Sequence, residues 1–326
     1  MKRIIANIAD TYGIYDLHKE YSKNDQFSYI EEEVELLNSD SSSFYAKPSL
    51  PQIEFDEENQ EKEYKNGKLK FLSQVENEDC NKEAIFHSNI CVSENNDINI
   101  ILIHGWRASS LNRLEEVFLE SFKERKYNIY NYILPFHMER SEDTALYSGE
   151  SFVSANVSRT LKSIKQSISD IRALIRYIKE IKKGKIVIIG LSLGGIVSNL
   201  LAEVEENIDV LISLFYANDL SYTIFETEVG RYIKRDFVNN NFSKELLSKS
   251  WKIINPSLRK PVIDMDNILL ISGKYDKYVL NIDTDNLWNN WDKPLREIYI
   301  SGHSGIVLFK NKIKNDTLKF IDKRMK

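Results

Sequence analysis

One short stretch of the sequence has the residue types and spacing of a reactive serine. Residues 184–201 read GKIVIIGLSLGGIVSNLL, in which Gly190, Ser192 and Gly194 form a G-x-S-x-G pattern between an apolar run and a helical one. In that setting the serine lies on a sharp turn from strand to helix, and the flanking positions must be glycine because side chains there would collide with the neighbouring strand or helix. The pattern predicts a nucleophilic serine. A turn that is merely softened by glycine is the alternative interpretation.

A serine hydroxyl is a weak nucleophile and needs a histidine base that is oriented by an acid. On a turn of this kind the three residues follow the chain order serine, acid, histidine. Of the five histidines only His303 follows Ser192, and we therefore predict that it is the base. Asp276, which ends the apolar run ILLISGKYD, is the preferred acid. Asp219, which closes SLFYAND, is the alternative acid.

The oxyanion that forms in acyl transfer needs two preset backbone N–H donors. Leu193 follows the serine directly and supplies the first. The stretch IILIHGWRAS supplies the second, because Gly105 lets the backbone turn so that the Trp106 N–H faces the site. We interpret His104 as a structural histidine that bonds to loop backbone. The Trp106 indole is either a pocket wall or a packed side chain.

Eight strand-length segments are expected to position these residues: two that alternate or cluster apolar side chains, and six short apolar runs separated by helical segments. Runs without a polar face suit strands that are covered on both sides. They predict an α/β fold with a doubly wound, mainly parallel eight-stranded sheet, whose first two strands form an antiparallel edge. Ligands of such sheets bind at the carboxyl ends of the strands. The runs are 68–75, 83–92, 98–105, 128–135, 185–192, 209–218, 267–276 and 296–303.

One helix between these strands is clear from its apolar periodicity. In residues 158–181 apolar side chains recur every three or four positions, which predicts a single buried stripe. Gly184 follows at the place where glycine commonly ends a helix. The stripe consists of Leu161, Ile164, Ile168, Ile171, Ile175 and Ile178.

Together, the segments HGW, GLSLGG, GKYD and GHS resemble those of the α/β-hydrolase superfamily over residues 68–326. The resemblance implies the α/β-hydrolase fold and acyl chemistry at Ser192. The stretch L-P-x-H-x-x-R, which contains His137 and Arg140, is similar to a sparsely characterised branch taken to be serine esterases, some of which act on lipids. These two residues are then expected near the pocket mouth. Arg140 would either pair with a nearby glutamate or bind an anionic group of the substrate.

The chain is expected to have two parts, an acidic N-terminal extension over residues 1–67 and a hydrolase domain over residues 68–326. Residues 10–63 hold fifteen Asp or Glu against four Lys or Arg. Within the hydrolase domain, about 219–262 form a long insertion whose helical and aromatic content predicts a cap over the active site. Its aromatic side chains either line an acyl pocket or anchor the cap, namely Phe225, Tyr232, Phe237 and Trp251.

Composition narrows the function classes further. A net charge of −5 without a basic cluster argues against a nucleic-acid surface. Cys80 and Cys91 lack metal-ligand spacing and are expected to be reduced thiols, with one disulfide between them as the alternative. The first residues lack a signal-peptide core, and no apolar run approaches the roughly 18 residues that span a bilayer, so we expect a cytoplasmic protein without a transmembrane segment. Neither a metal nor an organic cofactor is implied, and the oligomeric state stays open.

The sequence therefore predicts a serine hydrolase that cleaves carboxylic esters of small molecules, with lipid esters among the candidates. An acyltransferase or a peptidase would use the same residues, because the constellation defines acyl chemistry and leaves the leaving group open. A binding protein that kept the fold without catalysis is a third interpretation, which the intact order of serine, acid and histidine disfavours.

Overall fold

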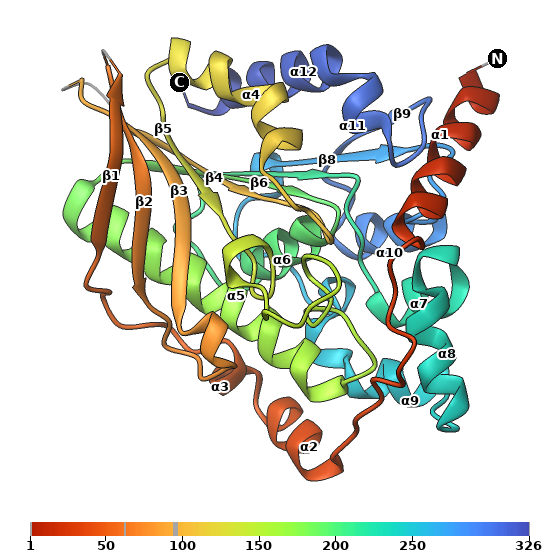
Figure 1. Ribbon diagram of the computed structural model, residues 1–326. Coiled ribbons are helices and arrows are strands. Elements are labelled where there is room, and N and C mark those ends of the chain that lie inside the picture. Colours follow the sequence, from red (N-terminus) through yellow and green to blue (C-terminus); the bar gives the residue numbers. More distant parts are fainter. Residues whose placement is uncertain (1, 62, 94–96, 326) are drawn as a thin grey trace.

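A nine-stranded β-sheet forms the centre of the described chain, which in this computed structural model comprises residues 2–61, 63–93 and 97–325 (Figure 1). The strand order is β1-β2-β3-β5-β4-β6-β7-β8-β9. From β5 to β9 neighbouring strands are parallel, whereas β1, β2 and β3 are antiparallel to one another and β3 joins β5 antiparallel. The expected mainly parallel α/β sheet with an antiparallel edge is confirmed.

The sheet has one strand more than the eight expected. Each predicted apolar run overlaps one of the strands β2 to β9, while β1 comes from the acidic region. β1 is nearly all exposed and polar, as suits an edge strand that must avoid pairing with another chain, and it therefore has no apolar pattern to reveal it. The strands are β1 Glu54–Glu61, β2 Tyr64–Leu72, β3 Glu83–Cys91, β4 Ile98–Ile103, β5 Asn128–Tyr132, β6 Lys185–Leu191, β7 Val210–Leu214, β8 Ile268–Gly273 and β9 Leu295–Tyr299.

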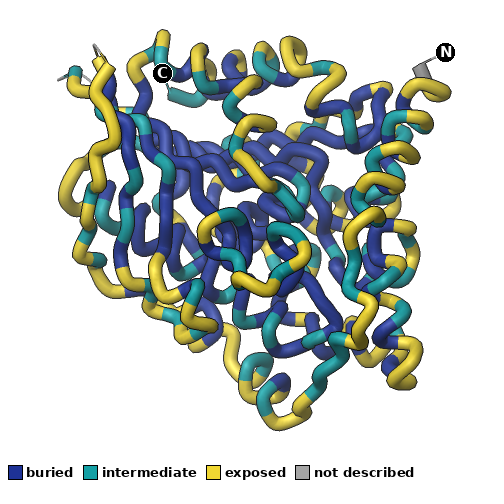
Figure 2. Tube along the Cα trace, in the orientation of Figure 1, coloured by how far each residue is buried: buried dark blue, intermediate teal, exposed yellow. Residues whose placement is uncertain are grey.

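Helices cover both faces of the sheet, and the strands between them are the most deeply buried part of the chain (Figure 2). Helices α4, α11 and α12 lie on one face, and α5 and α6 lie on the other (Figure 1). The helices are α1 Lys2–Leu17, α2 Glu31–Ser39, α3 Ser41–Phe44, α4 Asn112–Glu124, α5 Val157–Tyr177, α6 Leu193–Ala202, α7 Leu220–Glu226, α8 Arg231–Asn239, α9 Lys244–Ser250, α10 Asn281–Asn290, α11 Gly305–Leu308 and α12 Lys310–Arg324.

The long helix α5 buries the stripe that its periodicity predicts. All six of the predicted apolar side chains are at most 1 % exposed. The Asn156 side chain caps the start of the helix by accepting the Arg159 N–H at 3.0 Å. Beyond the helix, Gly184 has a φ of +119°, a conformation that L side chains rarely adopt.

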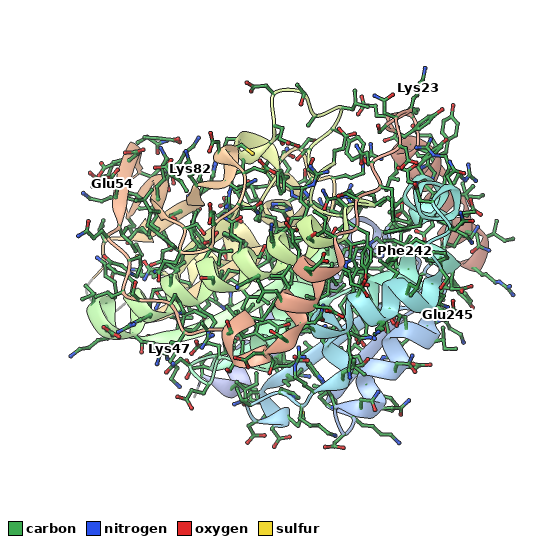
Figure 3. All side chains as sticks on the ribbon, turned by 90° about the horizontal axis from the view of Figure 1, so that it is seen from below. Lys23, Lys47, Glu54, Lys82, Phe242 and Glu245 are labelled. Carbon is green, nitrogen blue, oxygen red and sulfur yellow. The ribbon has the colours of Figure 1, made fainter. Side chains whose placement is uncertain are left out.

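The first 67 residues pack against the rest of the chain at several places. The expected division after residue 67 falls inside β2. The side chain of Val34, on α2, is buried in the same core cluster as α5. Figure 3 shows Lys23 on the same side of the molecule as Phe242 and Glu245, opposite Glu54 and Lys82. The extension thus runs from the helical insertion at one side of the molecule to the sheet edge at the other.

The insertion over 219–262 is helical where the sequence predicts a cap. It contains α7, α8 and α9, which lie together at the side of the molecule near α1 (Figure 1). Phe237 and Trp251 are buried, and the Trp251 indole donates to the Val157 carbonyl oxygen at 3.1 Å. Trp251 thus anchors the insertion to the start of α5, and the Phe237 ring packs edge-on against Trp251, with ring centroids 6.2 Å apart.

No helix among the described residues is long and apolar enough to cross a membrane.

Candidate active site

Ser192 lies at the turn between β6 and α6, with φ 55° and ψ −110°. Few residues other than glycine adopt a positive φ. A Cβ on Gly190 would overlap with Ser198 Oγ and the Gly194 carbonyl, and one on Gly194 would overlap with the Ile103 carbonyl. Both glycines are therefore required by close backbone approach. The turn carries the serine to the carboxyl end of β6, at the edge of the sheet where β8 also ends.

Three side chains from separate loops form one hydrogen-bonded series. His303 follows β9, and its Nε2 atom lies 3.0 Å from Ser192 Oγ. Its Nδ1 atom lies 2.8 Å from Oδ2 of Asp276, which follows β8. Because an ionised carboxylate only accepts hydrogen bonds, Nδ1 donates to Asp276 and Nε2 is left to accept the serine proton. A nucleophile, a base and an acid need this arrangement.

The two candidate acids have different partners. Asp276 is 6 % exposed, and its other oxygen, Oδ1, accepts the N–H groups of Tyr278 and Val279, each at 2.8 Å. Asp219 instead caps α7 by accepting the Tyr222 N–H at 3.1 Å. The geometry thus brings Asp276 to the histidine and gives Asp219 a local structural partner.

Two backbone N–H groups beside the serine have no acceptor among the described residues, those of Leu193 and Trp106. Leu193 is the first residue of α6, where the N–H has no intrahelical partner and the helix dipole favours negative charge. Gly105 brings the preceding loop close, since a Cβ there would lie 3.3 Å from the Ser192 Cβ. Both donors can therefore serve an anion that forms at the serine.

His104 holds the loop that carries Trp106. Burial lowers the pKa of His104 to about 4, so the ring is neutral near pH 7. Its Nδ1 donates to the Gly105 carbonyl at 2.9 Å, and its Nε2 accepts the Leu134 N–H at 3.1 Å. These bonds match the structural role expected for this histidine.

Aromatic contacts to His303 were missed by sequence reasoning. The Tyr278 ring stacks on the His303 ring with centroids 4.5 Å apart, and the Phe215 ring meets it edge-on at 6.1 Å. Neither residue belongs to a recognisable motif. Only the meeting of three loops places them there.

A small cavity of about 20 Å³ lies beside Trp106, between the N-terminal segment and the helical insertion. Trp106, Arg107 and Tyr147 are among the residues that line it. The Arg107 guanidinium lies over the Tyr147 ring, 3.4 Å from its centroid. Tyr21 and Tyr232, stacked with centroids 3.8 Å apart, also line it. Trp106 is thus a wall of the cavity, and its indole also donates to the Gly149 carbonyl at 2.8 Å.

The expected position of His137 and Arg140 at the pocket mouth is wrong, because both are fully buried. The Arg140 guanidinium lies 3.4 Å from Asp170 on α5 and donates to the Ile133 carbonyl at 2.8 Å. The ion-pair partner of Arg140 is therefore an aspartate and not one of the nearby glutamates. Burial also lowers the pKa of His137 well below its ordinary value. The sequence alone did not reveal that an aspartate of α5 points into the interior at this point.

The described residues contain no group of three or more His, Cys, Asp or Glu side chains that could hold a metal ion.

Comparison with known proteins identifies the family. No protein-family profile matches the chain. The uncharacterized protein YdjC of Bacillus subtilis is 45 % identical over 115 residues, which are 35 % of this chain and 99 % of YdjC. The chain belongs to the same family as YdjC. It is also 26 % identical over 181 residues to the uncharacterized protein Rv2627c of Mycobacterium tuberculosis, which covers 55 % of this chain and 42 % of that protein's length.

Solved structures show which fold this chain has. Acetyl xylan esterase 1 from Thermoanaerobacterium superposes with a TM-score of 0.64 and 14 % identity over 94 % of this chain and 98 % of that one. An acetyl xylan esterase from Paenibacillus gives 0.65 and 10 % identity over 95 % and 99 %. Acylaminoacyl peptidase from Pyrococcus horikoshii gives 0.59 and 12 % identity over 81 % and 42 %. The fold is therefore the α/β-hydrolase fold.

Proposed function

We propose that this protein is a serine hydrolase of carboxylic esters that carry a small acyl group. The observation that carries the proposal is the continuous series from Ser192 Oγ through His303 to Asp276, at 3.0 and 2.8 Å. Two similar structures are acetyl xylan esterases, which favours esters over other acyl compounds. Membership in the branch marked by L-P-x-H-x-x-R stays a prediction.

In the proposed reaction the Ser192 oxygen attacks the ester carbonyl carbon while His303 Nε2 takes the hydroxyl proton. The Leu193 and Trp106 N–H groups hold the negative oxygen of the tetrahedral intermediate. His303 then gives its proton to the leaving alkoxide, which departs as an alcohol and leaves the acyl group on Ser192. Water next attacks the acyl carbon while His303 takes a proton from it. The bond to the Ser192 oxygen breaks, His303 returns the proton to that oxygen, and the acyl group leaves as a carboxylic acid. Asp276 stays ionised throughout and keeps the histidine in the required tautomer.

The two acetyl xylan esterases among the similar structures favour a short acyl chain. We therefore expect p-nitrophenyl acetate to be turned over faster than esters of longer chain.

Covalent labelling tests the proposal most directly. A fluorophosphonate probe should label the wild-type protein at Ser192, and Ser192→Ala should take no label and lose turnover by about 10³-fold or more. Ser39→Ala, at the exposed end of α2, is the control and should match the wild type. A non-catalytic binding protein would take no label in any variant.

His303→Ala tests whether base and nucleophile act together. Its loss of turnover should equal that of Ser192→Ala, and the double variant should be no worse than either, because residues that act as one unit have non-additive effects. A much larger loss in the double variant would separate the two roles.

Peptide cleavage is the second candidate, favoured by the similarity to acylaminoacyl peptidase. The same residues would act, and only the leaving group differs. Comparison of an acetyl ester with an acetyl-amino-acid anilide on one protein preparation distinguishes the two activities. The ester should be turned over and the anilide should not.

A further inference from the structure

The N-terminal helix α1 contacts the loops that carry Asp276 and His303. Figure 1 shows α1 beside β9 and the helical insertion, far in sequence from both loops. Asp10, in the middle of α1, is 0 % exposed. Its Oδ2 accepts the N–H of Lys277 at 3.0 Å and the N–H of His303 at 2.9 Å, and its Oδ1 accepts the N–H of Ser304 at 3.0 Å. One carboxylate therefore joins the acid loop to the base loop.

These bonds account for the burial of a charged side chain. A carboxylate taken out of water is costly unless strong hydrogen bonds replace its hydration. Three N–H donors aimed at its two oxygens supply charge-assisted bonds of this kind. A Cβ on Gly302, which precedes His303, would overlap with the same carboxylate, so the glycine leaves room for it. Both sides of the contact are built for a close fit.

A second contact joins α1 to the base through Tyr278. A Cβ on Gly13 would overlap with the Tyr278 hydroxyl, so the helix backbone packs directly on this side chain. The Tyr278 ring in turn stacks on the His303 ring at 4.5 Å. Helix α1 therefore contacts His303 in two ways. The His303 backbone N–H donates to Asp10, and Tyr278 packs between α1 and the His303 ring.

We propose that Asp10 is a positioning residue for the active site, which holds the Asp276 and His303 loops at the separation that the hydrogen-bonded series requires. This inference rests on the proposed function. The physical reason is that proton transfer along the series depends on loop placement, and a displacement of about 1 Å can cost about 10²-fold in rate. The N-terminal extension is then part of the catalytic unit.

The rest of the N-terminal segment is held independently of Asp10. The Arg107 guanidinium donates to the Leu17 carbonyl and, at 2.9 Å, to the Glu20 carbonyl. His18 contacts the Glu228 carbonyl at 2.6 Å, and Tyr21 stacks on Tyr232. A change at Asp10 should therefore leave the segment docked, so its effect reports on the loops.

The test compares Asp10→Asn with Asp16→Asn in the full-length protein. The first variant keeps the side-chain shape but turns an amide N–H₂ towards backbone donors. The second makes the same charge change on the same helix at an exposed position. Turnover number, KM for p-nitrophenyl acetate and the rate of fluorophosphonate labelling are measured, with the melting temperature as a check of folding.

We expect Asp10→Asn to lower the turnover number and the labelling rate by about 10- to 100-fold at nearly unchanged KM. All Asp10→Asn molecules should still be labelled at long times, because each remains folded and reacts with the probe at a lower rate. Asp16→Asn should stay within about twofold of the wild type. A purely structural role predicts the opposite pattern, with fewer molecules labelled but each at the wild-type rate, and that result overturns the proposal.

Gly302→Ala supplies an independent variant, because it displaces the carboxylate without removing its charge. It should cause a similar loss, and the double variant with Asp10→Asn should show no further loss. Additive losses, or faster turnover in Asp10→Asn, overturn the proposal, and faster turnover would mean that α1 inhibits the site.

If wild-type Ser192 takes no label, the proposed function fails and the role of Asp10 fails with it. If the wild type is labelled and Asp10→Asn matches it, only the role of Asp10 fails.

Discussion

His303 Nδ1 and Asp276 Oδ2 lie 2.8 Å apart, although the two residues are 27 positions apart in the sequence. They meet because each follows one of two neighbouring parallel strands, β8 and β9. The same carboxylate accepts two backbone N–H bonds on its other oxygen. Asp276 is therefore held by its own loop, independently of its bond to the histidine. This relationship makes the choice between the two candidate acids testable.

Asp276→Asn should keep the fold and reduce turnover by up to about 10⁴-fold, because the amide leaves His303 in the wrong tautomer. Asp219→Asn is the matched control. Asparagine also caps helices well, so the cap on α7 persists and turnover changes little. Both variants are compared on one short-chain ester at pH 8. If Asp219→Asn is the impaired variant, the acid comes from the end of β7.

Gly194→Val should give insoluble or inactive protein, because its side chain would strike the backbone of β4 at Ile103. Gly190→Val should fail for the same kind of reason, against Ser198 and Gly194. Gly105→Ala is a milder comparison, since its Cβ would lie 3.3 Å from the Ser192 Cβ, and we expect it to fold with lowered turnover. Soluble yield and ester turnover are the measurements. Normal turnover in Gly194→Val would contradict the sharp-turn assignment.

Arg140→Met should lower the free energy of unfolding by about 3–5 kcal/mol, because it leaves Asp170 buried without its cation. KM should not change, since Arg140 does not reach the cavity wall. Lys162 lies on α5, as Asp170 does, and forms an exposed ion pair with Glu33 of α2. Lys162→Met should therefore lower the free energy of unfolding by at most about 1 kcal/mol. Urea unfolding and ester kinetics measure the two effects. A raised KM at unchanged stability would restore Arg140 as a substrate-binding residue.

Asp283 should make stability depend on pH. Burial raises the pKa of Asp283 to about 7, although N–H bonds from Asp219 and Asn218 oppose the rise. Between about pH 4 and pH 7 the folded state holds a proton that the unfolded state has released, so the contribution of Asp283 to the free energy of unfolding falls as pH rises through this range. Asp283→Asn cannot titrate.

The free energy of unfolding of wild type minus that of Asp283→Asn should therefore decrease from about pH 4 to about pH 7 and level off above it. Urea unfolding at several pH values measures it. Asp266→Asn, at an exposed position, serves as the control and should run parallel to the wild type. A constant difference for Asp283→Asn would show that this carboxyl is ionised over the whole range.

Local patterns in the sequence were enough to predict several parts of this protein. Strand-length apolar segments predicted β2 to β9, and the periodic stripe predicted α5. The G-x-S-x-G spacing predicted the turn at Ser192, because backbone crowding there admits only glycine. The chain order of serine, acid and histidine reduced five histidines to one. The inferences on strands, helix and turn use neighbours in the chain, whereas the choice of His303 uses only the chain order typical of this kind of turn.

Contacts between side chains that are distant in sequence could be found only from the folded structure. The edge strand β1 has no apolar alternation, and the ion pair between Arg140 and Asp170 joins residues that no local pattern relates. Asp10 accepts the backbone N–H of His303, which is 293 positions away in the sequence. Almost every residue type has such an N–H, so the sequence gives no sign of the bond. Such contacts depend on how whole helices dock on the sheet, because a long-range hydrogen bond forms only after packing has brought its two ends together.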